Sequence, residues 1–202
     1  ALATQPDHSS IITSPRSEPA LVIARAITKG YEGFRAIVSV SDVTYTYPGA
    51  VSPAVVHASF TVQPGGSVAF VGSTGAGKST LADVILGVLE PDTGSITISG
   101  TSPLEAIDTW PGAIAYVPQM VSILEGTVRD NVALGLPAHA VDDEWVWHAL
   151  DQAHLSSFLH RQRDGLDTRV GERGVRLSGG QRQRLGIARA LYTHPQVLVM
   201  HE

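Results

Sequence analysis

Cysteine is absent from the 202 residues, and this absence excludes disulfide bonds and thiolate metal sites. Long apolar runs are also missing. The stretches Ala20 to Ala24 and Val197 to Met200 are far shorter than the roughly 18 to 20 residues needed to cross a bilayer. No segment of this sequence is therefore expected to span a membrane.

Charged residues are sparse, at 16% of the chain, and the formal net charge is -5. Lys and Arg are scattered and form no basic stripe of the kind that neutralises nucleic-acid phosphates. Nucleic acid is therefore not expected as a partner. With 43% hydrophobic residues, the composition excludes disorder for most of the chain, and the length corresponds to one domain or slightly more.

The start of the chain has neither an initiator Met nor a signal-peptide pattern, so we expect a piece of a longer protein. Residues 1–19 are rich in Ser, Thr, Pro and Gln and show no periodicity. We interpret residues 1–36 as a linker or disordered N-terminal arm and residues 37–202 as one domain.

Hydrophobic patterning predicts an alternation of strands and helices in that domain. An antiparallel pair is expected from Ile37–Tyr47 and Val55–Val62, with further strands at Ser67–Val71, Ile96–Ser99 and Ile114–Val117. Expected helices are Thr127–Ala133, Asp143–Ala153 with Asp142 as its N-cap, and Leu155–Arg161. Trp145 and Trp147 flank the apolar face of the second helix and are interpreted as packing residues. An earlier helix would place Leu81, Val84, Ile85 and Val88 on one face.

A glycine-rich loop between the strand at Ser67–Val71 and that earlier helix carries the strongest chemical signal. Residues 72–79 match the spacing G-x-x-x-x-G-K-[ST]. Glycines let such a loop turn its backbone N–H groups around anionic oxygens, and the helix N-terminus adds its dipole. The predicted phosphate-binding residues are Gly72, Ser73, Thr74, Gly75, Ala76, Gly77, Lys78, Ser79 and Thr80.

Two of these residues have individual roles in this type of loop. Lys78 is expected to reach the β and γ phosphates, and Ser79 is expected to offer its hydroxyl to Mg²⁺. Thr80 is expected to be an additional phosphate contact. The loop by itself does not distinguish among the classes of nucleotide hydrolase.

A second string, Leu177-Ser178-Gly179-Gly180-Gln181, precedes an apolar helical pattern. Ser178 and Gln181 form a capping box that would open a helix in any protein. The free N–H groups at such a helix start also suit an anion. This string resembles the signature motif of ATP-binding cassette (ABC) proteins, in which it binds the γ-phosphate held by the partner subunit's glycine loop.

The resemblance to ABC proteins extends from Val38 to Glu202. Tyr47 matches the aromatic residue that stacks on adenine, although an ordinary strand-end Tyr is the alternative. Gln119 matches the glutamine that contacts Mg²⁺ and senses the transmembrane partner, and its alternative is a surface amide. Val197–Met200 matches the apolar strand of the Walker B motif, which would make Glu202 the general base. The resemblance thus implies Lys78, Gln119 and Glu202 as catalytic residues, Ser79 and Gln119 as metal ligands, and ATP and Mg²⁺ as cofactors.

The exporter subclass is indicated by Thr168–Gly174, which resembles the T-x-V-G-E-R-G loop of exporter-type cassettes. The implied fold is α/β, a P-loop NTPase with a RecA-like parallel core sheet, an antiparallel β-subdomain and a helical subdomain near residues 121–180. The implied function is ATP binding and hydrolysis that power export or flipping of a substrate across a membrane. The implied partners are a second nucleotide-binding domain in a head-to-tail dimer and a transmembrane domain, at the cytoplasmic face of the membrane.

Two departures from the family pattern stand out. His201 occupies the position of the aspartate before the catalytic glutamate, and a neutral imidazole brings no negative charge to Mg²⁺. The expected D-loop, switch histidine and remaining core strands do not occur before Glu202. We therefore expect this chain to bind nucleotide but to turn over little of it.

Two alternative functions stay open. A degenerate regulatory cassette that binds but does not hydrolyse nucleotide is favoured by His201. A soluble ABC-type ATPase of DNA maintenance or translation is the other alternative. It is opposed by the exporter loop and by the short spacing from Lys78 to Ser178, which leaves no room for a long coiled coil.

Overall fold

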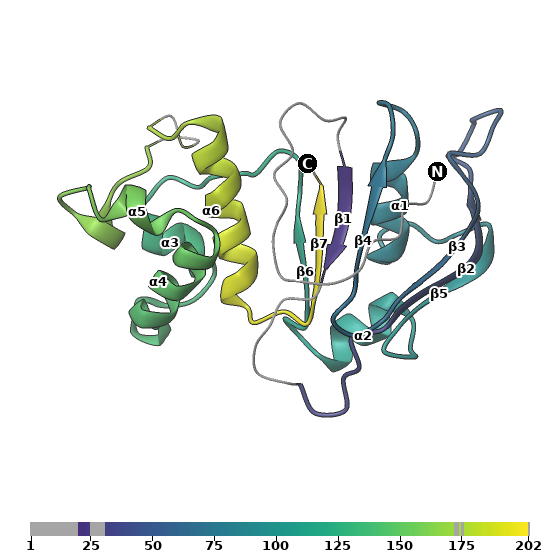
Figure 1. The fold of residues 1–202 in the computed structure, drawn as a ribbon, viewed down its shortest axis with the longest axis horizontal. Coiled ribbons are helices and arrows are strands. Elements are labelled where there is room, and N and C mark those ends of the chain that lie inside the picture. Colours follow the sequence, from purple (N-terminus) through teal and green to yellow (C-terminus); the bar gives the residue numbers. More distant parts are fainter. Residues whose placement is uncertain (1–19, 25–30, 172–173, 175, 202) are drawn as a thin grey trace. The chain divides into compact units, whose positions relative to one another are not determined.

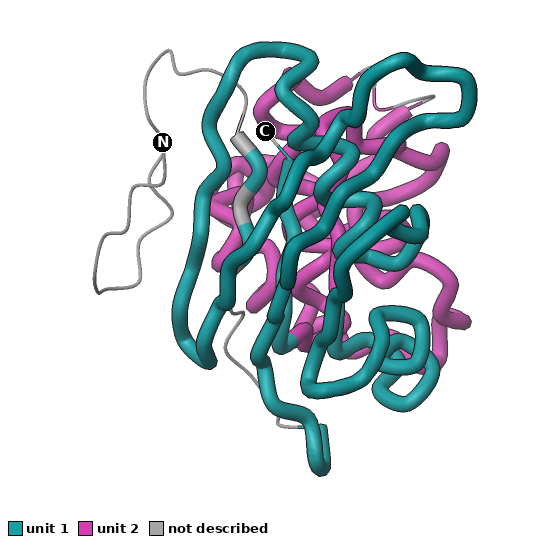
Figure 2. The backbone as a smooth tube through the Cα atoms, turned by 90° about the vertical axis from the view of Figure 1, so that its right-hand side faces the viewer, with its two compact units in different colours: residues 1–114, 196–202 teal, residues 115–195 magenta. Residues whose placement is uncertain are grey.

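The computed structural model describes residues 20–24, 31–171, 174 and 176–201. The chain divides into two compact units (Figure 2). Unit 1 comprises residues 1–114 and 196–202, and unit 2 comprises residues 115–195. In the described part of the chain, no helix combines the length and the apolar character needed to cross a membrane.

One sheet of unit 1 is antiparallel throughout. It consists of β2 (Val38–Tyr45), β3 (Val55–Val62) and β5 (Thr93–Ile98), in the order β3-β2-β5 (Figure 1). The inward residues of β2 alternate with half-buried or exposed ones until the pairing shifts beyond Val40. The antiparallel strand pair predicted from the sequence is confirmed, and β5 adds a third strand.

The second sheet of unit 1 contains β4 (Ser67–Val71), β1 (Ala20–Ala24) and β7 (Val197–His201) in that order (Figure 1). Strand β1 pairs antiparallel with both neighbours, so β4 and β7 run parallel to each other as the predicted core sheet requires. Strand β1 itself was not predicted, and its antiparallel direction departs from the all-parallel core sheet that was expected. Strand β6 (Ile114–Val117) begins at the last residue of this unit.

Strand β1 lies inside the segment that we interpreted as a linker or disordered arm. Leu21 and Ile23 are buried, at 0% and 1% exposure, and so belong to the core of unit 1. Their alternation suits a strand with one buried face. The polar composition of the flanking residues hid this short apolar run, and the interpretation was wrong for residues 20–24. Residues 1–19 and 25–30 of this segment lie outside the described part of the chain.

Two helices belong to unit 1. Helix α1 (Lys78–Ile85) packs against β1 and β7 and buries Leu81, Val84 and Ile85. Val88, predicted on the same face, is 71% exposed because the helix has already ended before Gly87, whose φ is +73°. Helix α2 (Pro103–Thr109) was not predicted, although the Ser102 side chain caps it by accepting a hydrogen bond from the Glu105 N–H at 3.3 Å.

In the part of unit 2 that the structure describes, the core is formed mainly by α-helices, and short 3-10 turns join them. They are α3 (Val128–Val132), η1 (Ala138–Ala140), α4 (Asp143–Gln152), α5 (Ser156–Leu159), η2 (Gly165–Asp167) and α6 (Gly179–Tyr192). All three helices predicted here are present, each shorter than predicted by one to three residues in total. Asp142 caps α4 as predicted, accepting from the Trp145 N–H at 3.1 Å.

Both tryptophans of α4 pack against histidine rings of the same unit. Trp145 stacks on His194 with ring centroids 4.0 Å apart, and Trp147 stacks on His160 at 4.6 Å. The interpretation of both residues as packing side chains is confirmed.

Candidate functional site

The glycine loop connects the end of β4 at Val71 to the start of α1 at Lys78, in the predicted strand, loop and helix order. Gly77 is the N-cap residue of α1 and has a φ of +83°. Helix α1 has no side-chain cap and no acidic residue in its first turn. The N–H groups of that turn are therefore left to an external acceptor, and the helix dipole favours an anionic one.

Gly77 is required by the fold of unit 1 as well as by the loop. A Cβ at this position would lie 2.2 Å from the carbonyl oxygen of Ala54, which immediately precedes β3. Gly75 also has a positive φ, +87°, but a Cβ there would meet nothing within 4 Å. The two glycines therefore differ: Gly77 needs both its backbone conformation and its missing side chain, whereas Gly75 needs the conformation only.

Lys78 is the buried cation of the loop, at 8% exposure. Its ammonium group donates hydrogen bonds to the carbonyl oxygens of Gly72 at 2.6 Å and Ser73 at 2.8 Å. These bonds hold the charge inside the turn of the loop. A cation surrounded by backbone groups in this way is placed to pair with an anion seated on the loop.

Tyr47 lies next to the first turn of α1, although it comes two residues after β2 in the sequence. Its hydroxyl forms a hydrogen bond with the Thr80 hydroxyl at 3.1 Å, and the residue as a whole is 42% exposed. The ring of Tyr45 supports it edge to face, with centroids 5.1 Å apart. Tyr47 therefore presents a braced aromatic surface beside the loop. Thr80, predicted as a phosphate contact, is 6% exposed and is bonded to Tyr47 instead of pointing into open space.

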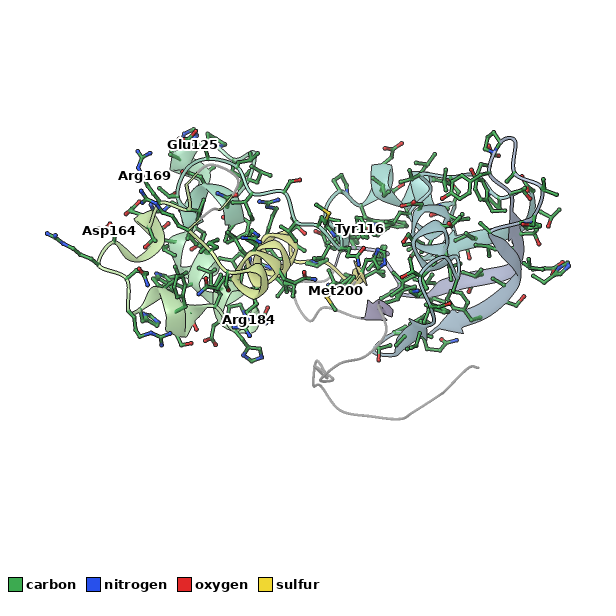
Figure 3. The ribbon with its side chains drawn as sticks, turned by 90° about the horizontal axis from the view of Figure 1, so that it is seen from above. Tyr116, Glu125, Asp164, Arg169, Arg184 and Met200 are labelled. Atoms are coloured by element: carbon green, nitrogen blue, oxygen red, sulfur yellow. The ribbon has the colours of Figure 1, made fainter. Side chains whose placement is uncertain are left out.

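Ser79 and His201 meet at the junction of α1 and β7. The Ser79 hydroxyl is 3.4 Å from Nε2 of His201, which is 7% exposed. His201 is the last residue of β7 and follows Met200, which is labelled in Figure 3. Burial raises the pKa of the nearby Asp83 carboxyl, and the charge of His201 opposes that rise.

The donors at this junction fit Mg²⁺ poorly. Mg²⁺ requires hard oxygen ligands, and the Ser79 hydroxyl is one, but an imidazole nitrogen stands where the family has a carboxylate. Across the part of the chain that the structure describes, no group of three or more His, Asp or Glu side chains forms a metal cluster. Any metal held here would take its remaining ligands from nucleotide phosphates or water.

The signature residues open α6 in unit 2. The Ser178 hydroxyl accepts from the Gln181 N–H at 3.2 Å, and the Gln181 side chain accepts from the Ser178 N–H at 2.8 Å, which confirms the predicted capping box. Gly179 and Gly180 are exposed, and a Cβ on Gly180 would meet nothing within 4 Å. The fold of this unit gives no steric reason for glycine at position 180.

Gln119 is exposed and lies in unit 2, two residues after β6. The structure therefore brings Tyr47, Lys78, Ser79 and His201 together within unit 1, while Gln119 and the signature residues belong to unit 2. Glu202, the predicted general base, lies outside the described residues.

A buried polar network of unit 2 was missed in the sequence. Asn131, at 0% exposure, exchanges hydrogen bonds with the backbone of Leu124, and Arg189 of α6 donates to its carbonyl and side-chain oxygens at 2.8 and 3.0 Å. Arg189 also donates to the carbonyl oxygen of Ser122 at 2.9 Å, and burial lowers its pKa. The segment after Gln119 is thereby fixed to the signature helix.

The start of the predicted exporter loop runs beside α3 in the same unit. The Val128 N–H donates to the Thr168 carbonyl at 3.0 Å, and the Val170 N–H donates to the Gly126 carbonyl at 3.0 Å. Thr127 and Arg169 form an isolated antiparallel bridge, and Arg169 is labelled in Figure 3. Two later residues of this loop, at positions 172 and 173, lie outside the described part.

Comparison with known proteins gives consistent matches. The sequence profile of a family described as "ABC transporter" matches residues 55–202. A multidrug resistance ABC transporter ATP-binding and permease protein of Lactococcus lactis is 42% identical over 146 residues, which cover 71% of this chain and 24% of that protein. An ATP-dependent lipid A-core flippase of Thiobacillus denitrificans is 41% identical over 162 residues, which cover 80% of this chain and 28% of that protein.

A solved structure, that of a bacterial Atm1-family ABC exporter with ATP bound, is similar in fold to most of this chain. The TM-score is 0.67 at 29% identity, and the match covers 87% of this chain and 30% of that one. This chain thus spans 24 to 30% of the length of these three proteins.

Proposed function

The chain belongs to the ABC transporter family, and on that premise we propose that it is the ATP-binding domain of an ATP-driven exporter or flippase. One observation carries the proposal: the uncapped N-terminus of α1 and the buried ammonium of Lys78 face the same glycine loop. ATP binding and hydrolysis are the general chemistry of this family.

The phosphates of ATP are proposed to bind in the turn formed by Gly72–Thr80. Backbone N–H groups of the loop and of the first turn of α1 would donate to the β and γ phosphates. Lys78 would exchange its bonds to the two loop carbonyls for bonds to phosphate oxygens, which are stronger acceptors because they are charged. In this arrangement, the buried Lys78 ammonium and the N-terminus of α1 supply the positive potential at the phosphates, so that a cluster of surface Lys and Arg residues is not needed.

The adenine ring is proposed to stack on Tyr47. The 42% exposure of this residue, together with its support from Tyr45 and Thr80, gives a rigid aromatic surface next to the phosphate loop. A stacked base is worth about 1–3 kcal/mol in other nucleotide sites. Stacking involves only the face of the base and does not distinguish one base from another, so selectivity for adenine would depend on other contacts.

Hydrolysis needs groups beyond the loop. Glu202 is proposed as the general base that polarises the attacking water, and Gln119 as a residue that helps to orient it. Phosphoryl transfer depends on positioning and electrostatic stabilisation acting together. His201 weakens this arrangement, because it brings no negative charge beside Ser79.

A second nucleotide-binding domain is proposed to bind head to tail, so that Ser178, Gly179, Gly180 and Gln181 reach the γ-phosphate on the partner's loop. The exposure of the first three residues and the open space around Gly180 support this proposal. The N–H groups at the start of α6 would add a further anion-binding helix terminus.

The membrane partner is proposed to be a transmembrane domain of the same transporter, with this domain at the cytoplasmic face. The Lactococcus relative is named as an ATP-binding and permease protein, so both activities lie on one chain there. The substrate would be selected by that membrane domain.

A regulatory cassette that binds ATP without hydrolysing it is the second candidate, and His201 is the observation that favours it. A soluble ATPase of DNA maintenance or translation finds no support, since the relatives described above are transporters and the signature follows the exporter loop.

The proposal is tested by calorimetric titration of the 202-residue chain with ATP, ADP, AMP and inorganic triphosphate, with Mg²⁺ and separately with Mn²⁺. We expect AMP to bind at least about 10-fold more weakly than ATP, because it lacks the two phosphates that the loop and Lys78 would hold. Triphosphate is expected to bind about 5- to 150-fold more weakly than ATP, which corresponds to the loss of adenine stacking.

Two outcomes of the same titration would contradict the proposal. AMP binding as tightly as ATP would remove the glycine loop as the phosphate site. Triphosphate binding as tightly as ATP would leave the loop in place and remove Tyr47 as the adenine contact.

A further inference from the structure

The segment that carries Tyr47 is contacted by two separate parts of unit 1. Tyr47 comes two residues after β2, beyond the last residue pairs that hold β2 to β3 and β5. Its hydroxyl is bonded to Thr80 in the first turn of α1. The chain then leaves α1 and returns to the same segment at Asp92, immediately before β5. Asp92 therefore lies where it can act on the backbone next to Tyr47.

Two hydrogen bonds of Asp92 hold this backbone. The carboxylate accepts from the Thr46 N–H at 2.8 Å, a distance typical of a bond to a charged acceptor. The Asp92 N–H donates to the Thr44 carbonyl oxygen at 2.9 Å. The last residue of β2 that pairs with β5 is Thr44, so Asp92 extends the fixed part of the chain to Thr46, the residue directly before Tyr47.

The turn that presents Asp92 is itself fixed against β2. The pairing of β2 with β5 shifts between Ser41 and Thr44. Gly94 lies against this irregularity, where a Cβ would be 2.4 Å from the carbonyl oxygens of Ser41 and Asp42. Only glycine allows so close an approach. The sheet thus gives Asp92 a defined position, although its side chain is exposed.

Fixing the backbone before Tyr47 matters for a stacking residue. A ring that is already oriented before the base arrives avoids the entropic cost of being ordered on binding. The Thr80 bond restrains Tyr47 at its hydroxyl, and the Tyr45 ring supports it edge to face. The bond between Asp92 and the Thr46 N–H restrains the other end of the side chain, at the backbone.

We propose that Asp92 is a positioning residue for nucleotide binding, which orients Tyr47 toward the adenine ring through the Thr46 N–H and does not itself touch the nucleotide. This inference rests on the proposed stacking of adenine on Tyr47 and names a residue that prepares that surface. Loss of the bond weakens binding of the base and leaves binding of the phosphates unchanged, because the glycine loop has its own hydrogen bonds to Lys78.

The first experiment compares the affinities of ATP and inorganic triphosphate for the 202-residue chain in the presence of Mg²⁺. Asp92→Ala is expected to lower the ratio of ATP affinity to triphosphate affinity by about 3- to 10-fold, the scale of one hydrogen bond, with triphosphate affinity unchanged. Asp92→Asn keeps an oxygen acceptor for Thr46 and is expected to retain most of the ratio. The control is Asp108→Ala, which removes an exposed carboxylate from α2 and should leave both affinities unchanged.

The contrary outcomes of this comparison are distinct. An unchanged ratio in Asp92→Ala, with wild-type protein that prefers ATP, would overturn the inference alone. An equal loss of ATP and triphosphate affinity would also refute it, since Asp92 would then act on the whole site. If wild-type protein bound triphosphate as tightly as ATP, adenine stacking on Tyr47 would fail and this inference with it.

The second experiment measures hydrogen exchange of the Thr46 amide in the absence of nucleotide, and so does not depend on affinity. We expect this amide to be protected in the wild-type protein and in Asp92→Asn, and to exchange about 3- to 10-fold faster in Asp92→Ala. An unprotected Thr46 amide in the wild-type protein would rule out the proposal without reference to any variant.

Discussion

Lys78→Ala is expected to weaken ATP binding to this domain by at least about 100-fold. A hydrogen bond to a charged group contributes about 1.5–3 kcal/mol, and Lys78 is proposed to make such bonds to the β and γ phosphates. The side chain is buried at 8% exposure and lies across the loop, so solvent screens its charge weakly. Isothermal calorimetry with ATP would measure the loss.

A matched control distinguishes the loss of a phosphate contact from the loss of one positive charge. Arg163→Ala removes one positive charge from an exposed position in unit 2 and should leave ATP affinity unchanged. Circular dichroism and the thermal midpoint would show whether Lys78→Ala keeps its fold, since the Gly72 and Ser73 carbonyls lose a donor. A folded Lys78→Ala protein with wild-type affinity would show that phosphate does not bind at this loop.

Gly77→Ala is expected to disrupt both the loop and unit 1. Forcing a residue with a Cβ into the left-handed region costs about 1–2 kcal/mol, and the new Cβ would also lie 2.2 Å from the Ala54 carbonyl oxygen. Relief of that contact requires the segment before β3 to shift away from α1, and overpacking of this kind costs a further 1–3 kcal/mol, roughly. Urea unfolding would report the change in free energy, and calorimetry the loss of ATP binding.

Gly75→Ala provides the comparison, because it carries nearly the same backbone strain without the contact. We expect Gly77→Ala to be less stable than Gly75→Ala by about 2 kcal/mol and to bind ATP at least about 10-fold more weakly. Equal stabilities for the two variants would mean that the approach of Ala54 to Gly77 does not constrain the loop.

Local signals in the sequence were enough to predict the glycine loop and the helix starts. The loop spacing fixes which residues precede α1. A polar side chain that accepts from the N–H three residues later fixes the helix starts at Asp142 and Ser178. The same type of signal at Ser102 was overlooked, and with Pro103 it would have located α2. Such features need only four or five consecutive residues.

Contacts between residues far apart in the sequence could not be predicted from local sequence patterns. Ala20–Ala24 forms a strand only because β4 and β7 leave room for one between them, and more than 170 residues separate it from β7. The approach of His201 to Ser79 has the same origin, since α1 packs on β7. Asn131 is buried because Arg189 and the backbone near Leu124 form hydrogen bonds with it. The residues next to Asn131 in the sequence do not indicate either contact.

Backbone amide chemical shifts of the isotopically labelled chain during an ATP titration test the central claim most directly, namely that nucleotide phosphates bind the N–H groups of the glycine loop. The account predicts that the largest shifts occur in residues 72–80, with a smaller shift at Tyr47, two residues after β2. AMP is expected to shift the Tyr47 amide without reproducing the shifts of the loop. Saturable ATP binding with the shifts concentrated elsewhere, while residues 72–80 stay unchanged, would contradict it.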